Sequence, residues 1–177
     1  METQQARYLT LQFTCNEKNA LFPDESSRLF FLRQAEKWLF QQHKTLVWSL
    51  GHTSAIIMIE KPERLTNLKT TLSKINRKYS RYLRKKTGNK ALMTGSKLIY
   101  LHEYTQTDLK DLVIRIHMMP MQQGLGENFI EYPWTSYLQL LNPKHCNLDH
   151  IEVISWFGNK QNYRKQHHQE LVNITGK

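Results

Sequence analysis

A tyrosine set among basic residues is the first feature of this sequence that could carry chemistry. Residues 61–90 hold 11 of the chain's 25 Lys and Arg residues and a single acid, Glu63. Ammonium and guanidinium groups bind phosphates, and the phenol of Tyr79 is a group that can attack one. The segment therefore has two interpretations. One is a core helix with a solvated basic face, and the other is a helix that holds a phosphate backbone and presents a phenol to it.

One long helix is predicted to position these residues. Apolar side chains recur at alternating steps of three and four, which is one stripe of an α-helix: Leu65, Leu68, Leu72, Ile75, Tyr79 and Tyr82. Pro62 suits the first turn of this helix, and Gly88 suits its C-terminal stop. The candidate DNA-binding residues lie off the stripe: Lys74, Arg77, Lys78, Arg81, Arg84, Lys85 and Lys86.

The charge of the whole chain favours a polyanionic partner. The formal net charge is +10 and the pI is about 9.6, which attracts nucleic acid or an anionic membrane. The longest apolar run, residues 55–59, is too short to cross a bilayer, and the first residues lack the pattern of a signal peptide. Cys15 and Cys146 stand alone. We therefore expect a reduced cytoplasmic protein that binds nucleic acid, with no membrane partner.

The order of the predicted elements indicates the fold class. Strands are predicted at residues 7–14, 45–49, 54–60 and 98–104, and helices at residues 25–43, 62–87 and 107–118. This order predicts an α+β, ferredoxin-like split βαβ fold, with a four-stranded antiparallel sheet and the two main helices on one face. Residues 1–120 would form this core. Residues 121–177 would form a C-terminal extension of short helices packed on the core, within a single structural domain.

Residues 116–137, IHMMPMQQGLGENFIEYPWTSY, resemble the pattern YIH-x-NP-x-x-x-GL … YPWSSY of REP-associated tyrosine transposases. These are relatives of the single-tyrosine HUH transposases of insertion sequences. Residues 148–165 resemble the family's helical tail, residues 46–60 its MPNHVHLLI strand, and residues 79–83 its tyrosine-bearing helix. The resemblance implies a ferredoxin-like fold. It also implies a Mg²⁺ or Mn²⁺ ion held by two histidines one residue apart, and a tyrosine that attacks DNA and stays linked to a 5′ phosphate.

The chain departs from the family where the metal should bind. His52 falls on the first histidine of the pair, but Ser54 falls on the second, and a hydroxyl is a poor ligand beside imidazole. We therefore expect Mg²⁺ or Mn²⁺ to bind poorly, with Glu60 and Glu103 as candidate substitute ligands. Other losses are Gly51 for the family's Asn and Met119-Pro120 for its Asn-Pro. We expect Tyr79 to be a half-buried remnant of the nucleophile, on the helix that covers the strand face of positions 52 and 54.

The leading hypothesis is a DNA-binding protein of the HUH transposase type, which recognises hairpin or single-stranded DNA and has lost most or all cleavage. The first alternative is an active, metal-dependent DNA-nicking and joining transposase with Tyr79 as nucleophile. The second is a domesticated RNA-binding or interaction protein that keeps the fold. The sequence does not decide whether the protein is a monomer or a dimer.

His117 matches a family histidine, and we expect it to form a structural hydrogen bond.

Overall fold

The computed structural model describes residues 7–15, 20–88, 93–101, 105–142 and 147–176. The elements follow in the order β1 (Tyr8–Cys15), α1 (Glu25–Ala35), the π-helical turn η1 (Glu36–Phe40), β2 (Thr45–Leu50), β3 (Ser54–Glu60), α2 (Leu65–Thr87), β4 (Met93–Leu101), α3 (Gln106–Gln122), α4 (Tyr137–Leu141), α5 (His150–Phe157) and α6 (Lys160–Thr175). The α+β class predicted from the sequence is confirmed.

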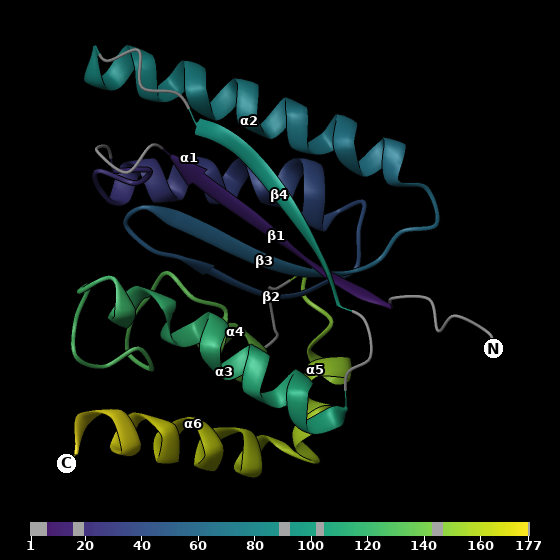
Figure 1. Ribbon diagram of the computed structural model, residues 1–177, viewed down its shortest axis with the longest axis vertical. Helices are drawn as coiled ribbons and strands as arrows, with labels where there is room; N and C mark the ends of the chain where they lie inside the picture. The colour runs from purple at the N-terminus through teal and green to yellow at the C-terminus, as the bar shows by residue number, and fades with distance from the viewer. Residues whose placement is uncertain (1–6, 16–19, 89–92, 102–104, 143–146, 177) are drawn as a thin grey trace.

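The strands form one antiparallel sheet in the order β2-β3-β1-β4. Helices cover both faces of this sheet: α1 and α2 lie on one face, and α3 to α6 lie on the other (Figure 1). Strand β4 begins at Met93, earlier than the predicted start at residue 98, and residues 102–104 of that prediction lie outside the described residues. Because both faces are covered, the side chains of β2 are all buried.

The ends of the helices follow from local chemistry. Asp24 caps α1 by accepting a hydrogen bond from the backbone N–H of Ser27 at 2.9 Å. Helix α2 ends where Gly88 takes a left-handed conformation with φ 65°, as predicted. Pro62 lies before α2, which begins at Leu65, so its predicted place in the first turn is wrong. Helix α3 continues past Pro120 to Gln122, beyond the predicted end at residue 118.

The free edge of β2 is closed by the C-terminal part of the chain. Trp134 accepts a backbone hydrogen bond from Leu50 at 2.9 Å, and Ser136 donates one to the carbonyl of Trp48 at 2.9 Å. Farther along the same edge, Asp149 donates to the carbonyl of Thr45 at 2.8 Å. The YPWTSY segment therefore protects an edge that would otherwise present unpaired backbone groups. No helix in the described parts of the chain is long and apolar enough to cross a membrane.

Candidate nucleic-acid interface

The outer face of α2 presents a row of cations to solvent. Its inner face is buried through Leu68, Leu72, Ile75, Tyr79 and Leu83, so the predicted apolar stripe faces the core. Of the predicted DNA-binding residues, Lys74 is half-buried and the others are exposed: Arg77, Lys78, Arg81, Arg84, Lys85 and Lys86. Among the described residues, Lys86 is the one member of this set that pairs with an acid. The others carry charge that no acid of the described chain neutralises.

Lys86 has a structural partner at the start of α1. Its ammonium lies 2.5 Å from a carboxylate oxygen of Asp24, the residue that caps α1, and it also donates to the hydroxyl of Ser26. The hydrogen bond from Lys86 is the largest cause of the lowered pKa of Asp24. Lys86 therefore joins the C-terminal end of α2 to the N-terminal end of α1, and it is less available to a ligand than its neighbours.

A tryptophan missed by the sequence analysis lies among three of the lysines. The ammonium groups of Lys37, Lys74 and Lys78 lie 5.3, 5.1 and 5.1 Å from the centroid of the Trp38 ring. We call Trp38 with these lysines the Trp38 cluster. Its members come from η1 and α2, which are separate in sequence, so periodicity within one helix gave no signal for it. The signal that was present is a tryptophan beside a lysine in an otherwise apolar helix.

Tyr79 is enclosed by aromatic rings on the α1–α2 side of the sheet. It is 0% exposed, so the expectation of a half-buried side chain is wrong. Its hydroxyl donates to the carbonyl of Leu21 at 2.6 Å, and its ring packs edge-on against Phe31 and tilted against Phe22. Burial raises the pKa of the phenol. In this arrangement, the candidate nucleophile has no access to a phosphate, and the group that its hydroxyl contacts is a backbone carbonyl, which is not a base.

The bend before β3 is held by Gln123, the residue at the C-terminal cap of α3. The Oε1 atom of Gln123 accepts from the backbone N–H groups of His52 and Thr53 at 2.7 and 3.0 Å. Its Nε2 atom donates to the hydroxyl of Ser54 at 2.8 Å. We call these contacts the Gln123 clamp. A Cβ at position 51 would lie 2.3 Å from Gln123 Oε1, so glycine there makes room for the clamp.

The clamp overturns the expected geometry of positions 52 and 54. Strand β3 begins at Ser54, so His52 lies in the preceding bend rather than on the same strand face. The Ser54 hydroxyl contacts Met119 of α3 and Gln123 just after it, whereas α2 covers the opposite face of the sheet (Figure 1). The prediction that the basic helix covers this position is therefore wrong. The hydroxyls of Tyr79 and Ser54 contact different layers of the molecule.

The residues around Ser54 do not fit a hard divalent ion. Mg²⁺ and Mn²⁺ prefer carboxylate, carbonyl and water ligands. Here the Ser54 hydroxyl accepts a hydrogen bond from the side-chain amide of Gln123 and lies near the thioether of Met119. The side-chain oxygen of Gln123 is already used as well, because it accepts from the backbone N–H groups of His52 and Thr53. Among the described residues, no three His, Cys, Asp or Glu side chains gather as metal ligands. Of the substitute ligands, Glu103 lies outside the described residues, and Glu60 lies at the far end of β3, about 20 Å away along the strand.

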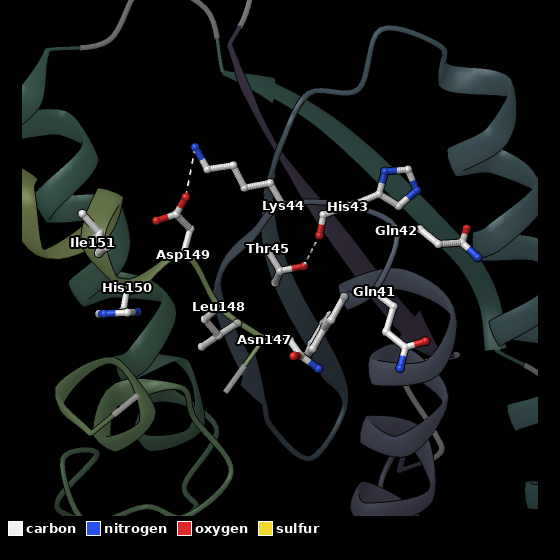
Figure 2. A pocket seen from close by; sticks show the side chains of 11 residues that line it. Gln41, Gln42, His43, Lys44, Thr45, Asn147, Leu148, Asp149, His150 and Ile151 are labelled. Carbon is white, nitrogen blue, oxygen red and sulfur yellow. Dashed lines mark hydrogen bonds and ion pairs between the residues drawn. The ribbon is translucent and has the colours of Figure 1, made fainter. Parts of the chain in front are cut away.

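Glu60 instead belongs to an ion-pair network beside a surface groove. The groove has a volume of about 500 Å³ and is lined by residues 40–45 and 147–151 (Figure 2). Lys44 on its rim points towards Asp149, at 3.0 Å, and also pairs with Glu60 and Glu152. Arg7 pairs with Glu60 and Glu152 from the other side. Two cations pair with three acids in this network, so neither cation is free to bind a phosphate.

A chain of buried hydrogen bonds links α6, α3, α4 and β2. The Nδ1–H of His167 donates to the Tyr163 carbonyl at 2.8 Å, so its Nε2 accepts from the Nδ1–H of His117 at 3.0 Å. The Nε2 of His117 then accepts from the hydroxyl of Ser136 at 2.9 Å, and Ser136 accepts from the backbone N–H of Trp48 at 3.0 Å.

We call His167, His117 and Ser136, with the hydrogen bonds that join them, the His117–His167 relay. Both imidazoles and the Ser136 side chain are 0% exposed. A serine and a histidine at this distance resemble a nucleophile and its base, but a substrate has no access to them. Burial lowers the pKa of His117 and lowers that of His167 to about 4, so both rings are neutral near pH 7. The geometry agrees with the structural hydrogen bond expected for His117.

Comparison with known proteins gives a likeness of fold without a sequence match. No protein-family model and no curated protein matches the chain. The structure of a REP-associated tyrosine transposase bound to a REP hairpin is similar, with a TM-score of 0.57 and 10% identity over 80% of this chain and 82% of that chain.

Two structures of a bacterial tRNA(His) guanylyltransferase (Thg1)-like protein, with GTP and with ATP, have TM-scores of 0.47 and 0.43. They share 12% and 14% identity, over 71% and 92% of this chain and 67% and 71% of those chains. Likenesses this weak carry no argument about activity. The chain therefore shares its fold with a REP-associated tyrosine transposase, and its function must be argued from its own residues.

Proposed function

We propose that this protein binds single-stranded or hairpin DNA through the outer face of α2 and does not cleave it. The observation that supports the proposal most strongly is the row of exposed cations on α2 that have no acid partner among the described residues: Arg77, Lys78, Arg81, Arg84 and Lys85. Binding of phosphates would neutralise this row and release counterions from the nucleic acid.

We also propose that the chain is a distant relative of the REP-associated tyrosine transposases. The resemblance of residues 116–137 to that family's pattern supports this, and so does the shared fold. The transposase in the similar structure is bound to a REP hairpin. Hairpin DNA is therefore the first ligand to test with this chain.

The proposed loss of cleavage follows from two features of the residues in the family's chemical positions. The Tyr79 hydroxyl is enclosed and bonded to Leu21, and the Ser54 hydroxyl is held by Gln123. An active transposase, the first alternative, would require the α1–α2 layer to open and release Tyr79. It would also require a set of metal ligands other than the residues around Ser54.

Binding and cleavage are tested with one set of labelled oligonucleotides. Fluorescence anisotropy compares a DNA hairpin, its unpaired loop strand and an RNA hairpin of the same sequence. A denaturing gel then reports covalent adducts after incubation with Mn²⁺. We expect DNA binding and no adduct. An adduct that disappears in Tyr79→Phe would establish the transposase alternative, and tighter binding to the RNA hairpin would favour an RNA-binding protein.

A further inference from the structure

The Trp38 cluster concentrates three positive charges on one aromatic ring. The three ammonium groups lie 5.1–5.3 Å from the ring centroid, near the outer limit of about 6 Å for a cation–π contact. Like charges this close repel one another, and no acid of the described residues pairs with these three lysines. The cluster therefore favours binding of an anion. The cluster is therefore suited to phosphate on the basis of charge.

Trp38 is partly exposed, but its one polar side-chain atom is not. The side chain is half-buried, while its Nε1 atom is shielded from solvent. Trp38 lies in the middle of the π-helical turn Glu36–Phe40, a widened turn that is found often at functional sites. Because Nε1 is shielded while the residue keeps some exposure, we infer that this tryptophan offers a surface for stacking rather than a hydrogen-bond donor.

Two further aromatic side chains continue the seam between α1 and α2. Phe30 and Tyr82 are half-buried and stack face to face, with centroids 4.1 Å apart and ring planes 8° apart. Lys86 lies 5.7 Å from the Tyr82 centroid. The seam therefore carries both aromatic rings and cations. Proteins that bind single-stranded nucleic acids use the same combination, in which bases stack on the rings and cations hold the backbone.

We propose that the Trp38 cluster is a binding site for single-stranded DNA, in which a base stacks on the Trp38 ring while Lys37, Lys74 and Lys78 move outward to the flanking phosphates. This inference rests on the proposed DNA binding and assigns it to a particular side chain. A structural role for the cluster, in which the lysine stems merely cover an apolar ring, is the competing explanation. Stacking distinguishes the two explanations, because a base that stacks on Trp38 changes its fluorescence, whereas a purely structural cluster binds no base.

The test uses oligothymidylate and the intrinsic tryptophan fluorescence of the full chain. The chain has four tryptophans, so the signal of Trp38 is the difference between the parent and Trp38→Phe. Trp38→Leu removes the aromatic face without a change of charge. A triple variant, Lys37→Gln/Lys74→Gln/Lys78→Gln, removes the cations. Its matched control removes three charges from the opposite layer: Lys110→Gln, Arg164→Gln and Lys165→Gln. Circular dichroism confirms that each variant is folded.

We expect oligothymidylate to quench the parent, and Trp38→Phe to lose most of that quenching with a small loss of affinity. Trp38→Leu should bind about 5- to 150-fold more weakly, which is the usual value of one stacked base. The triple variant should weaken binding more than its control. Polyglutamate, which has charge but no bases, should leave Trp38 fluorescence unchanged.

If the parent binds DNA but the Trp38 variants match it in affinity and quenching, this inference is wrong and the proposed function stands. If the parent binds no DNA, the proposed function itself fails.

Discussion

On the face of the sheet that α3 to α6 cover, buried polar groups are joined to one another across helices. The His117–His167 relay connects three helices to β2, and the Gln123 clamp fastens α3 to the bend before β3. On the other face, α2 leaves a row of cations in solvent, and the Trp38 cluster gathers three of the chain's lysines on one ring. The buried polar groups of the relay and the clamp satisfy one another. The second face concentrates exposed cations on one helix and beside aromatic rings, which is why we assign binding to it.

Acid should break the satisfied layer first. In the folded state, the pKa of His167 is about 4, below the ordinary value of 6.5, so the unfolded chain binds a proton that the folded chain excludes. This contribution to stability is fully present above pH 6.5 and is lost as the pH falls to 4. Over this window, we expect His167 alone to lower the free energy of unfolding by about 3 kcal/mol.

Urea denaturation at a series of pH values measures this loss. The groups that face His167 from neighbouring elements are His117, Tyr137, Phe129 and Phe157, none of which carries charge in this range while the relay is intact. His150→Gln, in a residue outside the relay, is the control and should keep the same pH dependence. A stability that stays flat between pH 6.5 and 4 would show that the relay is open to solvent.

Gln123→Ala should lower the free energy of unfolding by about 2 kcal/mol, because it leaves two backbone N–H groups and the Ser54 hydroxyl without the glutamine that bonds them. Gln122→Ala, in the exposed neighbour, should cost much less. Gly51→Ala would place a Cβ 2.3 Å from Gln123 Oε1 and should disrupt the same clamp. Chemical denaturation should therefore show that the double variant loses less than the sum of the two single losses. Additive losses would contradict a single clamp.

Tyr79→Phe should cost about 1 kcal/mol, because it leaves the buried carbonyl of Leu21 without its hydrogen bond. Its affinity for hairpin DNA should equal that of the parent, because the hydroxyl is enclosed. Thermal denaturation and anisotropy measure the two quantities on the same sample. A large loss of affinity without a loss of stability would place the Tyr79 hydroxyl in contact with DNA and revive it as a candidate nucleophile.

Local patterns in the sequence predicted the parts of the fold that depend on local chemistry. Strand β3 has the predicted bounds, residues 54–60, because its apolar run is continuous, and α2 ends at Gly88 because glycine accepts the left-handed conformation. The side of α2 that faces solvent followed from its apolar stripe. These features depend on the residues of one element and its immediate neighbours.

The candidate site was harder to predict because it depends on contacts between distant elements. Gln123 reaches the bend before β3 across 71 residues of sequence, and nothing in a glutamine's surroundings indicates such a partner. The family resemblance predicted that Tyr79 and Ser54 face each other on one side of the sheet, whereas in the structure they lie on opposite sides. The Trp38 cluster combines side chains of η1 and α2, so it could be recognised only from the packing of these two elements.

The central claim, that binding belongs to the α1–α2 layer, is tested most directly by the salt dependence of DNA affinity in two charge-matched variants. One changes Arg77, Arg81, Arg84 and Lys85 to Gln, and the other changes Lys110, Arg115, Arg164 and Lys165 to Gln. Each phosphate contact on a single strand contributes about −0.7 to the slope of log K against log salt. We expect the first variant to flatten the slope by about 3 and the second to leave it unchanged. A flattened slope in the second variant, with the parent slope retained in the first, would contradict the account.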